Sequence, residues 1–325
     1  MKKSLGTYLG FVVAAFLLAI SVVVLRDQIK DYRLADIQQS FSNISIGQIV
    51  ASFGFTLLGY AAMTGYDAQA LRYLQQPLSY RRTATANFIS TALSNTIGFA
   101  VLTGGAVRYR LYSAWGISAI TTAEVIAFSS FTFWLGLFTL GSVGFLLSPL
   151  AIPLDLQLSF ATARPLGALF LLLMVTYLLC SATIRRSLKL GKYTFQFPDL
   201  SVTLAQTALS SLDWGLAAAV LYMLLPSQDI SYFSFLNIYL LAMTAGVLSN
   251  VPGGAGVFDT VIVLLLVEKV PGEAVLASLL AYRVIYYLIP FGLAAGLLLY
   301  REGTQKMRAQ KLRRLAEERV LQEGD

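Results

Sequence analysis

The chain has 325 residues, of which 57% are hydrophobic and only 13% are charged, whereas a soluble domain averages about 25% charged residues. This composition excludes a soluble globular protein, so the formal net charge of +7 has to be read loop by loop at the membrane faces and does not indicate nucleic-acid binding. The sequence contains no histidine and a single cysteine, Cys180, which excludes histidine acid–base chemistry, histidine metal ligands and an intramolecular disulfide.

Long apolar runs predict membrane-spanning helices along the chain. The first uncharged run, residues 5–25, is long enough to span, since about 20 residues are needed, and we expect a retained helix and not a cleaved signal peptide. Further full spans are predicted at 46–66, 117–147, 165–184, 200–225 and 274–300. Residues 1–300 are therefore expected to form a single integral membrane domain, followed by a basic amphipathic cytoplasmic tail over 301–325.

Two further apolar segments, about 83–107 and 231–268, are interrupted by residues that break helices. Glycine permits unusual backbone angles and proline removes a hydrogen-bond donor, so neither segment is expected to form one continuous helix. Unpaired backbone groups in lipid cost several kcal/mol each, so the breaks are expected to be buried in protein or to line a wet cavity. The residues assigned to the two breaks are Asn95, Gly98, Gly104 and Gly105 in the first, and Asn250, Pro252, Gly253, Gly254 and Gly256 in the second.

Basic residues orient the chain, because loops rich in Lys and Arg stay in the cytoplasm. The N-terminus, the tail and the loops at 67–82 and 185–192 carry such residues, whereas the loops at 148–163 and 226–233 carry none. The loop at 26–45 departs from this pattern, because it holds basic residues on the predicted outer side. With both termini inside, segments 83–116 and 231–272 each have to return to the face that they leave. Each is predicted to be a re-entrant hairpin or two short crossings, and the two enter from opposite faces.

The tripeptide Leu-Ser-Asn occurs twice, at 93–95 and at 248–250, just before each break. Shifting the chain by the distance between the two copies overlays the spans of residues 5–147 on those of residues 165–300, and corresponding spans run in opposite directions. The alternative is a chance match of three common residues. The sequence thus predicts an all-α polytopic membrane protein with two inverted-topology repeats, built from about six full spans and two re-entrant hairpins.

Ionisable side chains in apolar segments are costly and therefore mark candidate functional sites. Asp213, Asp259 and Arg283 lie within such segments, and Asp67, Arg108 and Arg110 lie nearer their ends. A guanidinium group suits two-point binding of a phosphate. The structural alternative for Arg108 and Arg110 is anchoring at the lipid headgroups.

The remaining candidates also have structural alternatives. Arg283 could form a buried ion pair with Asp213 or Asp259, and Asp259 could instead stabilise a helix N-terminus. Asn95 and Asn250 could cap exposed backbone groups or touch a ligand. The 17 tyrosines and Trp115 are expected in interfacial belts and are assigned no chemistry.

Four stretches of the sequence resemble one known family. They are GYDAQALRYLQQPLSYRR (65–82), SNTIGFAVLTGGAVRYRLYSAWGIS (94–118), SNVPGGAGVFD (249–259) and AYRVIYYLIP (281–290). The chain resembles the N-terminal membrane domain of bacterial phosphatidylglycerol lysyltransferases, also called multiple peptide resistance factors, and the stand-alone lysylphosphatidylglycerol synthase transmembrane-region proteins. The family often has Glu where Asp259 stands.

The resemblance implies a flippase that moves lysylphosphatidylglycerol between the leaflets of the bacterial cytoplasmic membrane and so contributes to resistance to cationic antimicrobial peptides. In the family a soluble domain transfers lysine to the lipid. These 325 residues contain no such domain, so transferase activity is not expected of this chain alone. Under this hypothesis Arg108, Arg110 and Arg283 bind the lipid phosphate. Asp67, Asp213 and Asp259 bind the headgroup amines or couple protons.

Two other functions stay open at this point. The chain could be the membrane part of a lysylphosphatidylglycerol synthase or another enzyme acting on lipid headgroups, or a non-transporting partner of such an enzyme. The expected partners are an anionic or aminoacylated phospholipid, the membrane, and a second copy of the chain or a lipid synthase. No cofactor, metal or nucleic acid is expected. The sequence has no GxxxxGK[ST] motif, so the energy for transport would come from ion gradients, the membrane potential or lipid gradients.

Overall fold

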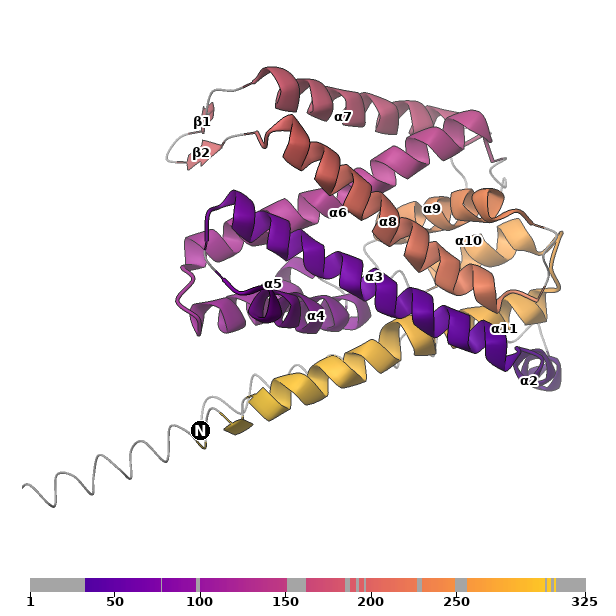
Figure 1. The fold of residues 1–325 in the computed structure, drawn as a ribbon. Helices are drawn as coiled ribbons and strands as arrows, with labels where there is room; N and C mark the ends of the chain where they lie inside the picture. The colour runs from indigo at the N-terminus through magenta and orange to yellow at the C-terminus, as the bar shows by residue number, and fades with distance from the viewer. Residues whose placement is uncertain are drawn as a thin grey trace, which may run out of the picture.

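The computed structural model describes residues 33–76, 78–97, 100–150, 162–184, 188–190, 193–195, 197–226, 230–248, 256–301, 303–304 and 307. The predicted first span at 5–25 and nearly all of the predicted tail lie outside these residues, as do Gly98, Asn250, Pro252, Gly253 and Gly254. Within the described residues the protein is helical apart from one short two-stranded hairpin (Figure 1).

Five of the described helices are long and apolar enough to cross a membrane, and each falls where a full span is predicted. They are α3 (Ile46–Tyr73), α6 (Ala119–Leu147), α7 (Arg164–Thr183), α8 (Leu200–Leu224) and the final span Gly272–Arg301. Even α7, with 20 residues, is about 30 Å long, since a helix rises 1.5 Å per residue. These spans make the protein a multi-pass membrane protein.

Local sequence signals set where the spans begin. The hydroxyl oxygen of Ser45 accepts a hydrogen bond from the Gln48 N–H at 3.2 Å, and the Gln48 side chain accepts one from the Ser45 N–H at 2.9 Å. This reciprocal cap starts α3. Ser118 starts α6 by accepting from the Thr121 N–H at 3.0 Å. Pro165 lies in the first turn of α7, where its missing N–H removes no helical hydrogen bond.

Each interrupted segment forms two shorter helices that pack against each other. The first gives α4 (Tyr80–Ile97) and α5 (Ala100–Ser113). The two helices are antiparallel: Gly104 of α5 faces Ser94 of α4, and Arg108, later in α5, contacts Thr91, earlier in α4. The second gives α9 (Tyr232–Leu248) and α10 (Val257–Leu266), which also contact each other. The α4–α5 pair lies at the end of the bundle where α3 finishes, and the α9–α10 pair lies toward the opposite end (Figure 1).

The last span is not a regular helix. It starts as α11 (Gly272–Tyr282), widens into a π-helical segment, η3 (Arg283–Leu288), and continues as α-helix to Arg301. The short helix α2 (Leu34–Ser42) packs against α11 through Ile37. Strands β1 (Leu188–Leu190) and β2 (Tyr193–Phe195) form an antiparallel hairpin between α7 and α8. This hairpin was not predicted, because three-residue strands are too short to show an alternating pattern.

The centre of the bundle is formed by α3, α6 and α8. The hydroxyl of Ser52 on α3 donates to the Val220 carbonyl on α8 at 3.0 Å. On α6, a side chain at Gly136 would bring its Cβ within 2.5 Å of the Ser210 carbonyl on α8, so only glycine allows the two backbones to approach this closely. Direct backbone contact of this kind fixes the positions of the buried polar residues on α3 and α8.

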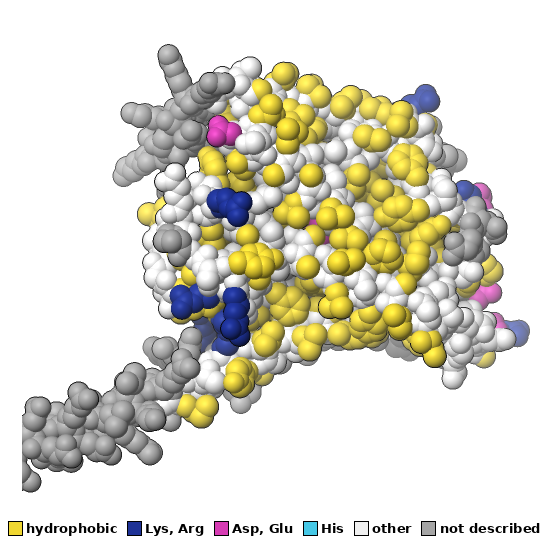
Figure 2. Space-filling model, viewed as in Figure 1, with side chains coloured by type: hydrophobic (Ala, Val, Ile, Leu, Met, Phe, Trp, Pro, Cys, Tyr) yellow, Lys and Arg dark blue, Asp and Glu magenta, His cyan; other side chains and the backbone are white. Residues whose placement is uncertain are grey.

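The surface separates into apolar and charged zones. Hydrophobic side chains cover the middle of the face shown in Figure 2, and Lys and Arg side chains lie toward its two ends, with the larger groups at the left. At the predicted cytoplasmic side, the guanidinium groups of Arg82 and Arg301 lie 5.9 and 5.0 Å from the ring centroid of Trp115. These are cation–π distances. Trp115 thus joins the start of α4 to the end of the last span, consistent with a membrane interface.

Candidate functional site

Asp67 and Arg108 form the first of two buried ion pairs in the described part of the chain. Asp67 lies on α3 and is fully buried, and Arg108 on α5 is 9% exposed. The Arg108 Nε lies 2.9 Å from Asp67 Oδ2. The Arg108 Nη2 also donates to the Thr91 hydroxyl on α4 at 3.3 Å. The family resemblance implies different roles for these two residues, and the structure brings them into direct contact.

Three neutral donors complete the surroundings of the Asp67 carboxylate. Tyr112 on α5 donates to Oδ2 at 2.6 Å, and Asn87 on α4 and Ser129 on α6 donate to Oδ1 at 3.0 and 2.8 Å. Both carboxylate oxygens therefore have two partners each. The hydrogen bonds that Asp67 would make with water are therefore replaced by hydrogen bonds within the protein. The cluster also ties the α4–α5 pair to α3 and α6.

The second ion pair joins Arg283 to Asp259. Arg283 is the first residue of η3, and its Nη2 donates to Asp259 Oδ2. The same oxygen accepts from the Gly256 N–H at 3.0 Å, in the first turn of α10. Arg283 therefore pairs with Asp259 and not with Asp213, the other predicted partner. Asp259 also lies at the N-terminus of a helix, as predicted. Gly256 has φ +85°, which favours glycine at this turn.

This second pair retains unused hydrogen-bonding capacity. Arg283 Nε and Asp259 Oδ1 are both buried and have no partner among the described residues. Buried polar atoms are nearly always satisfied in native proteins, so each exception needs an explanation. A π-helical segment is also uncommon and often marks a functional site. The pair at η3 is therefore positioned to accept further polar groups, whereas the Asp67 cluster is largely saturated.

Asp213 is the third buried acid, and it has no arginine. It lies on α8, is 2% exposed and accepts a hydrogen bond from the Tyr66 hydroxyl on Oδ2 at 2.7 Å. Its Oδ1 has no partner among the residues that the structure describes. The predicted alternative in which Asp213 pairs with Arg283 is wrong, because Arg283 points to Asp259.

A layer of buried tyrosines corrects the expectation that tyrosines lie in interfacial belts. Tyr60, Tyr239, Tyr282 and Tyr286 are each at most 5% exposed. The hydroxyls of Tyr239 and Tyr282 lie 2.8 Å apart, and the Tyr60 hydroxyl donates to the Tyr286 carbonyl at 3.1 Å. The Tyr282 and Tyr286 rings stack with centroids 5.3 Å apart. Tyr282 and Tyr286 also lie close to Arg283 in the sequence. Only that spacing, Tyr-Arg-x-x-Tyr-Tyr at 282–287, could have indicated them.

The other predicted site residues lie elsewhere. Arg110 is in the last turn of α5 and is exposed, so it is not part of the Asp67 cluster. Asn95, near the end of α4, lies beside the Tyr60 hydroxyl. Gly104 presses against Ser94, where an added Cβ would come within 2.8 Å of the hydroxyl oxygen, and Gly105 faces Ile126. Gly104 and Gly105 lie within α5 and not at the helix break to which they were assigned; Gly104 serves the packing of α5 against α4, and Gly105 the packing of α5 against α6.

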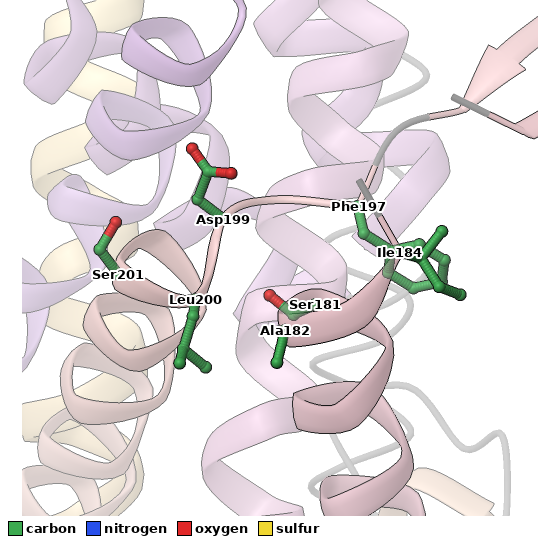
Figure 3. A pocket seen from close by; sticks show the side chains of 7 residues that line it. All are labelled: Ser181, Ala182, Ile184, Phe197, Asp199, Leu200 and Ser201. Carbon is green, nitrogen blue, oxygen red and sulfur yellow. The ribbon is translucent and has the colours of Figure 1, made fainter. Parts of the chain in front are cut away.

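A pocket of about 530 Å³ lies away from the two ion pairs, where α7 ends and α8 begins. Figure 3 shows its lining residues, which are Ser181, Ala182, Ile184, Phe197, Asp199, Leu200 and Ser201. Among the described residues, Asp199 is the only charged residue that lines the pocket, and none of the predicted site residues lines it. We assign the pocket no part in the site.

Comparison with known proteins gives the family of this chain. The sequence model described as lysylphosphatidylglycerol synthase TM region matches residues 8–294. The chain belongs to this family. The matched residues include both helical pairs and both ion pairs.

Individual members of the lysylphosphatidylglycerol synthase transmembrane-region family differ in length. Protein slr0712 of Synechocystis is 41% identical over 284 residues, which cover 87% of this chain and 88% of the relative. The inner membrane protein YbhN of Escherichia coli is 29% identical over 314 residues, covering 95% and 96%. The phosphatidylglycerol lysyltransferase of Staphylococcus haemolyticus is 27% identical over 311 residues, which cover 94% of this chain but 35% of the lysyltransferase. The chain thus matches about a third of the lysyltransferase and nearly the whole of the other two relatives.

Proposed function

We propose that this protein moves an aminoacylated phosphatidylglycerol, of the lysylphosphatidylglycerol type, between the leaflets of the bacterial cytoplasmic membrane. The observation that carries the proposal is the pair of Arg–carboxylate contacts, Arg108–Asp67 and Arg283–Asp259, buried in a membrane bundle. The family name and the lysyltransferase relatives point to the same class of lipid. Movement toward the outer leaflet would contribute to resistance to cationic peptides, because it places positive charge on the cell surface.

The charges of the headgroup match those of an ion pair. Lysylphosphatidylglycerol carries one phosphate and two ammonium groups, so it can offer an anion to the arginine and a cation to the carboxylate. Breaking a buried pair without replacement costs about 3–5 kcal/mol. A headgroup that supplies both charges at once removes this cost, whereas a lipid that carries only a negative charge or no charge does not. The unused capacity of Arg283 and Asp259 makes their pair the better candidate for this exchange.

The arrangement of the helical pairs supports a path across the membrane. The α4–α5 and α9–α10 pairs lie toward opposite ends of the bundle, as expected of re-entrant hairpins that enter from opposite faces (Figure 1). Inverted-topology repeats with broken helices bind substrates near the middle of the bilayer in many transporters. We propose that the two hairpins are such a pair, in repeats of about residues 5–147 and 165–300, and that the headgroup passes between them.

A transfer assay tests this proposal. Purified full-length protein is reconstituted in vesicles with fluorescent lysylphosphatidylglycerol or fluorescent phosphatidylglycerol, and the fraction of label accessible to an external quencher is followed. We expect faster leaflet transfer of the lysyl lipid without chemical change. Formation of a new lipid would instead support the membrane part of an enzyme. Binding with neither transfer nor product would support a non-transporting partner of a lipid-modifying enzyme.

Replacing Arg283 is expected to slow this transfer. Loss of a charged hydrogen bond is worth about 1.5–3 kcal/mol, so Arg283→Ala should reduce the rate at least about tenfold. The alanine variant leaves Asp259 without its arginine, so Arg283→Lys is tested beside it. Lysine keeps the positive charge but lacks the planar group of N–H donors of arginine, so this variant should fold and still transfer the lipid slowly. Arg164→Ala, at an exposed residue of α7, is the control. Normal transfer by both Arg283 variants at normal expression would refute the role of Arg283.

A further inference from the structure

The three buried acids in the described part of the chain are not equivalent. Asp67 and Asp259 each contact an arginine, and Asp213 contacts none. Asp213 lies near the middle of α8, the helix that packs most extensively against α3. Its Oδ2 accepts from Tyr66 at 2.7 Å, and its Oδ1 is buried without a hydrogen-bond partner. The charge of this carboxyl group is therefore not balanced by a neighbouring cation.

Among the residues that the structure describes, the groups that face Asp213 are all uncharged. Tyr60 and Tyr66 on α3, Tyr239 on α9 and Tyr286 on η3 are the titratable side chains within electrostatic range. The described residues of α6, α7 and α11, which also contact α8, present no Lys, Arg, Asp or Glu that interacts with it. At the Oδ1 side, the position that a Cβ on Gly59 would occupy lies 4.0 Å away, so this oxygen faces the α3 backbone and not a polar group.

An ionised carboxylate in such surroundings is costly, because burial without a partner disfavours the charged form. A neutral carboxylic acid avoids this cost with one bound proton. The acid can still accept from Tyr66 on one oxygen while the other carries the hydrogen. The shape of the site is unchanged, so the packed arrangement of α3 against α8 is compatible with the protonated form.

We propose that Asp213 is a reversible proton-binding site that couples lipid movement to the proton gradient. The inference rests on the proposed function and adds its energy source. In the closed arrangement seen here Asp213 holds a proton on Oδ1, and it releases that proton when α3 and α8 separate and water reaches the Gly59 side. The step makes and breaks one O–H bond, with water as the proton donor and acceptor.

The charge balance of the exchange favours this coupling. The lysylphosphatidylglycerol headgroup carries one net positive charge, and moving it outward against a negative-inside potential costs about 2.3 kcal/mol per 100 mV. One proton that moves inward for each headgroup that moves outward makes the cycle electrically neutral. The proton gradient, acidic outside, then drives the lipid outward. No nucleotide is needed.

Infrared difference spectroscopy tests the proton site without relying on transport. Full-length protein in vesicles should show the carbonyl stretching band of a protonated carboxylic acid at neutral pH, and Asp213→Asn should lack this band. Asp199→Asn is the matched control, because Asp199 is exposed at the start of the same helix. A band that persists in Asp213→Asn, or a wild-type protein without the band, would overturn the proposal.

Transfer of fluorescent lysylphosphatidylglycerol tests the coupling. A gradient of one pH unit, acidic outside, should shift the steady-state outer-to-inner ratio about tenfold in wild type and in Asp199→Asn, and should have no effect in Asp213→Asn. Equal responses of wild type and Asp213→Asn would overturn the coupling. Asparagine mimics the neutral acid, so a failure of Asp213→Asn to fold would also count against the proposal.

The two assays separate the proton site from the proposed function. If the band is lost in Asp213→Asn but no lipid moves in wild type, the proton site stands and lipid transport by this chain is wrong. If lipid moves but the band and the pH response are the same in wild type and Asp213→Asn, the proton site is wrong and lipid transport stands.

Discussion

Replacing Asp67 with alanine is expected to lower the free energy of unfolding by about 3–5 kcal/mol, because it leaves Arg108 buried without its counter-charge. Arg108 is 9% exposed and has no second carboxylate among the described residues. The substitution also removes the acceptor of Tyr112, Asn87 and Ser129. Thermal or denaturant unfolding of the purified protein in detergent, followed by circular dichroism, measures the loss. It is the largest effect that we expect from a single polar substitution.

Graded controls separate the ion pair from general damage. Tyr112→Phe removes one neutral donor and should cost about 1 kcal/mol. Asp36→Ala, at an exposed acid of α2, should change the stability by no more than about 0.5 kcal/mol. Removing both charges with Asp67→Asn and Arg108→Met should recover a large part of the loss, because no buried charge is then left alone. If Asp67→Ala proves as stable as Asp36→Ala, the Asp67–Arg108 contact contributes nothing to stability.

Gly136→Val is expected to prevent correct folding. Even the Cβ of alanine at this position would lie within 2.5 Å of the Ser210 carbonyl and 2.6 Å of the Trp214 ring. Overpacking a core usually costs about 1–3 kcal/mol when side chains can move aside. Here the obstacle is backbone, so α6 and α8 would have to separate along the contact that holds the bundle together. We expect little monodisperse protein in detergent extracts, measured by size-exclusion chromatography of a fluorescent fusion.

Two glycine substitutions provide the comparison for Gly136. Gly296→Ala adds a methyl group in the last span where no atom lies within 4 Å, so its yield should equal that of the wild type. Gly105→Ala meets only the end of the Ile126 side chain at 3.4 Å and should be tolerated. Wild-type yield and thermal stability of Gly136→Val would contradict the close approach of α6 and α8.

Hydropathy predicts the spans of this protein well, because a long apolar run in a membrane has to form a helix to satisfy its backbone hydrogen bonds. The five long helices correspond to the apolar runs at 46–66, 117–147, 165–184, 200–225 and 274–300. Their ends differ from the runs by a few residues, because polar residues continue some helices beyond the lipid. The glycine-containing segments likewise become shorter paired helices. The π-helical segment and the β hairpin have no comparable signal in the sequence.

The candidate site was predictable in its members but not in its contacts. Charge in an apolar segment identifies Asp67, Arg108, Asp213, Asp259 and Arg283. Which acid contacts which arginine depends on the rotation and register of the helices, and hydropathy gives no information about either. Tyr112, Asn87 and Ser129 are ordinary polar residues in sequence, and their common function appears only when α4, α5 and α6 meet around Asp67. The tyrosine layer was missed because a residue count does not distinguish buried from interfacial phenols.

The distribution of ion-pair partners along the chain bears on how the protein can be synthesised. All four groups that bind Asp67 lie within 62 residues after it, and Arg283 follows Asp259 by 24 residues. The aspartate of each ion pair can therefore be neutralised by a helix that emerges from the ribosome soon afterwards. Neither ion pair has to wait until the other half of the chain has been inserted. A nascent chain that ends after Ser129 already contains everything that its buried aspartate requires.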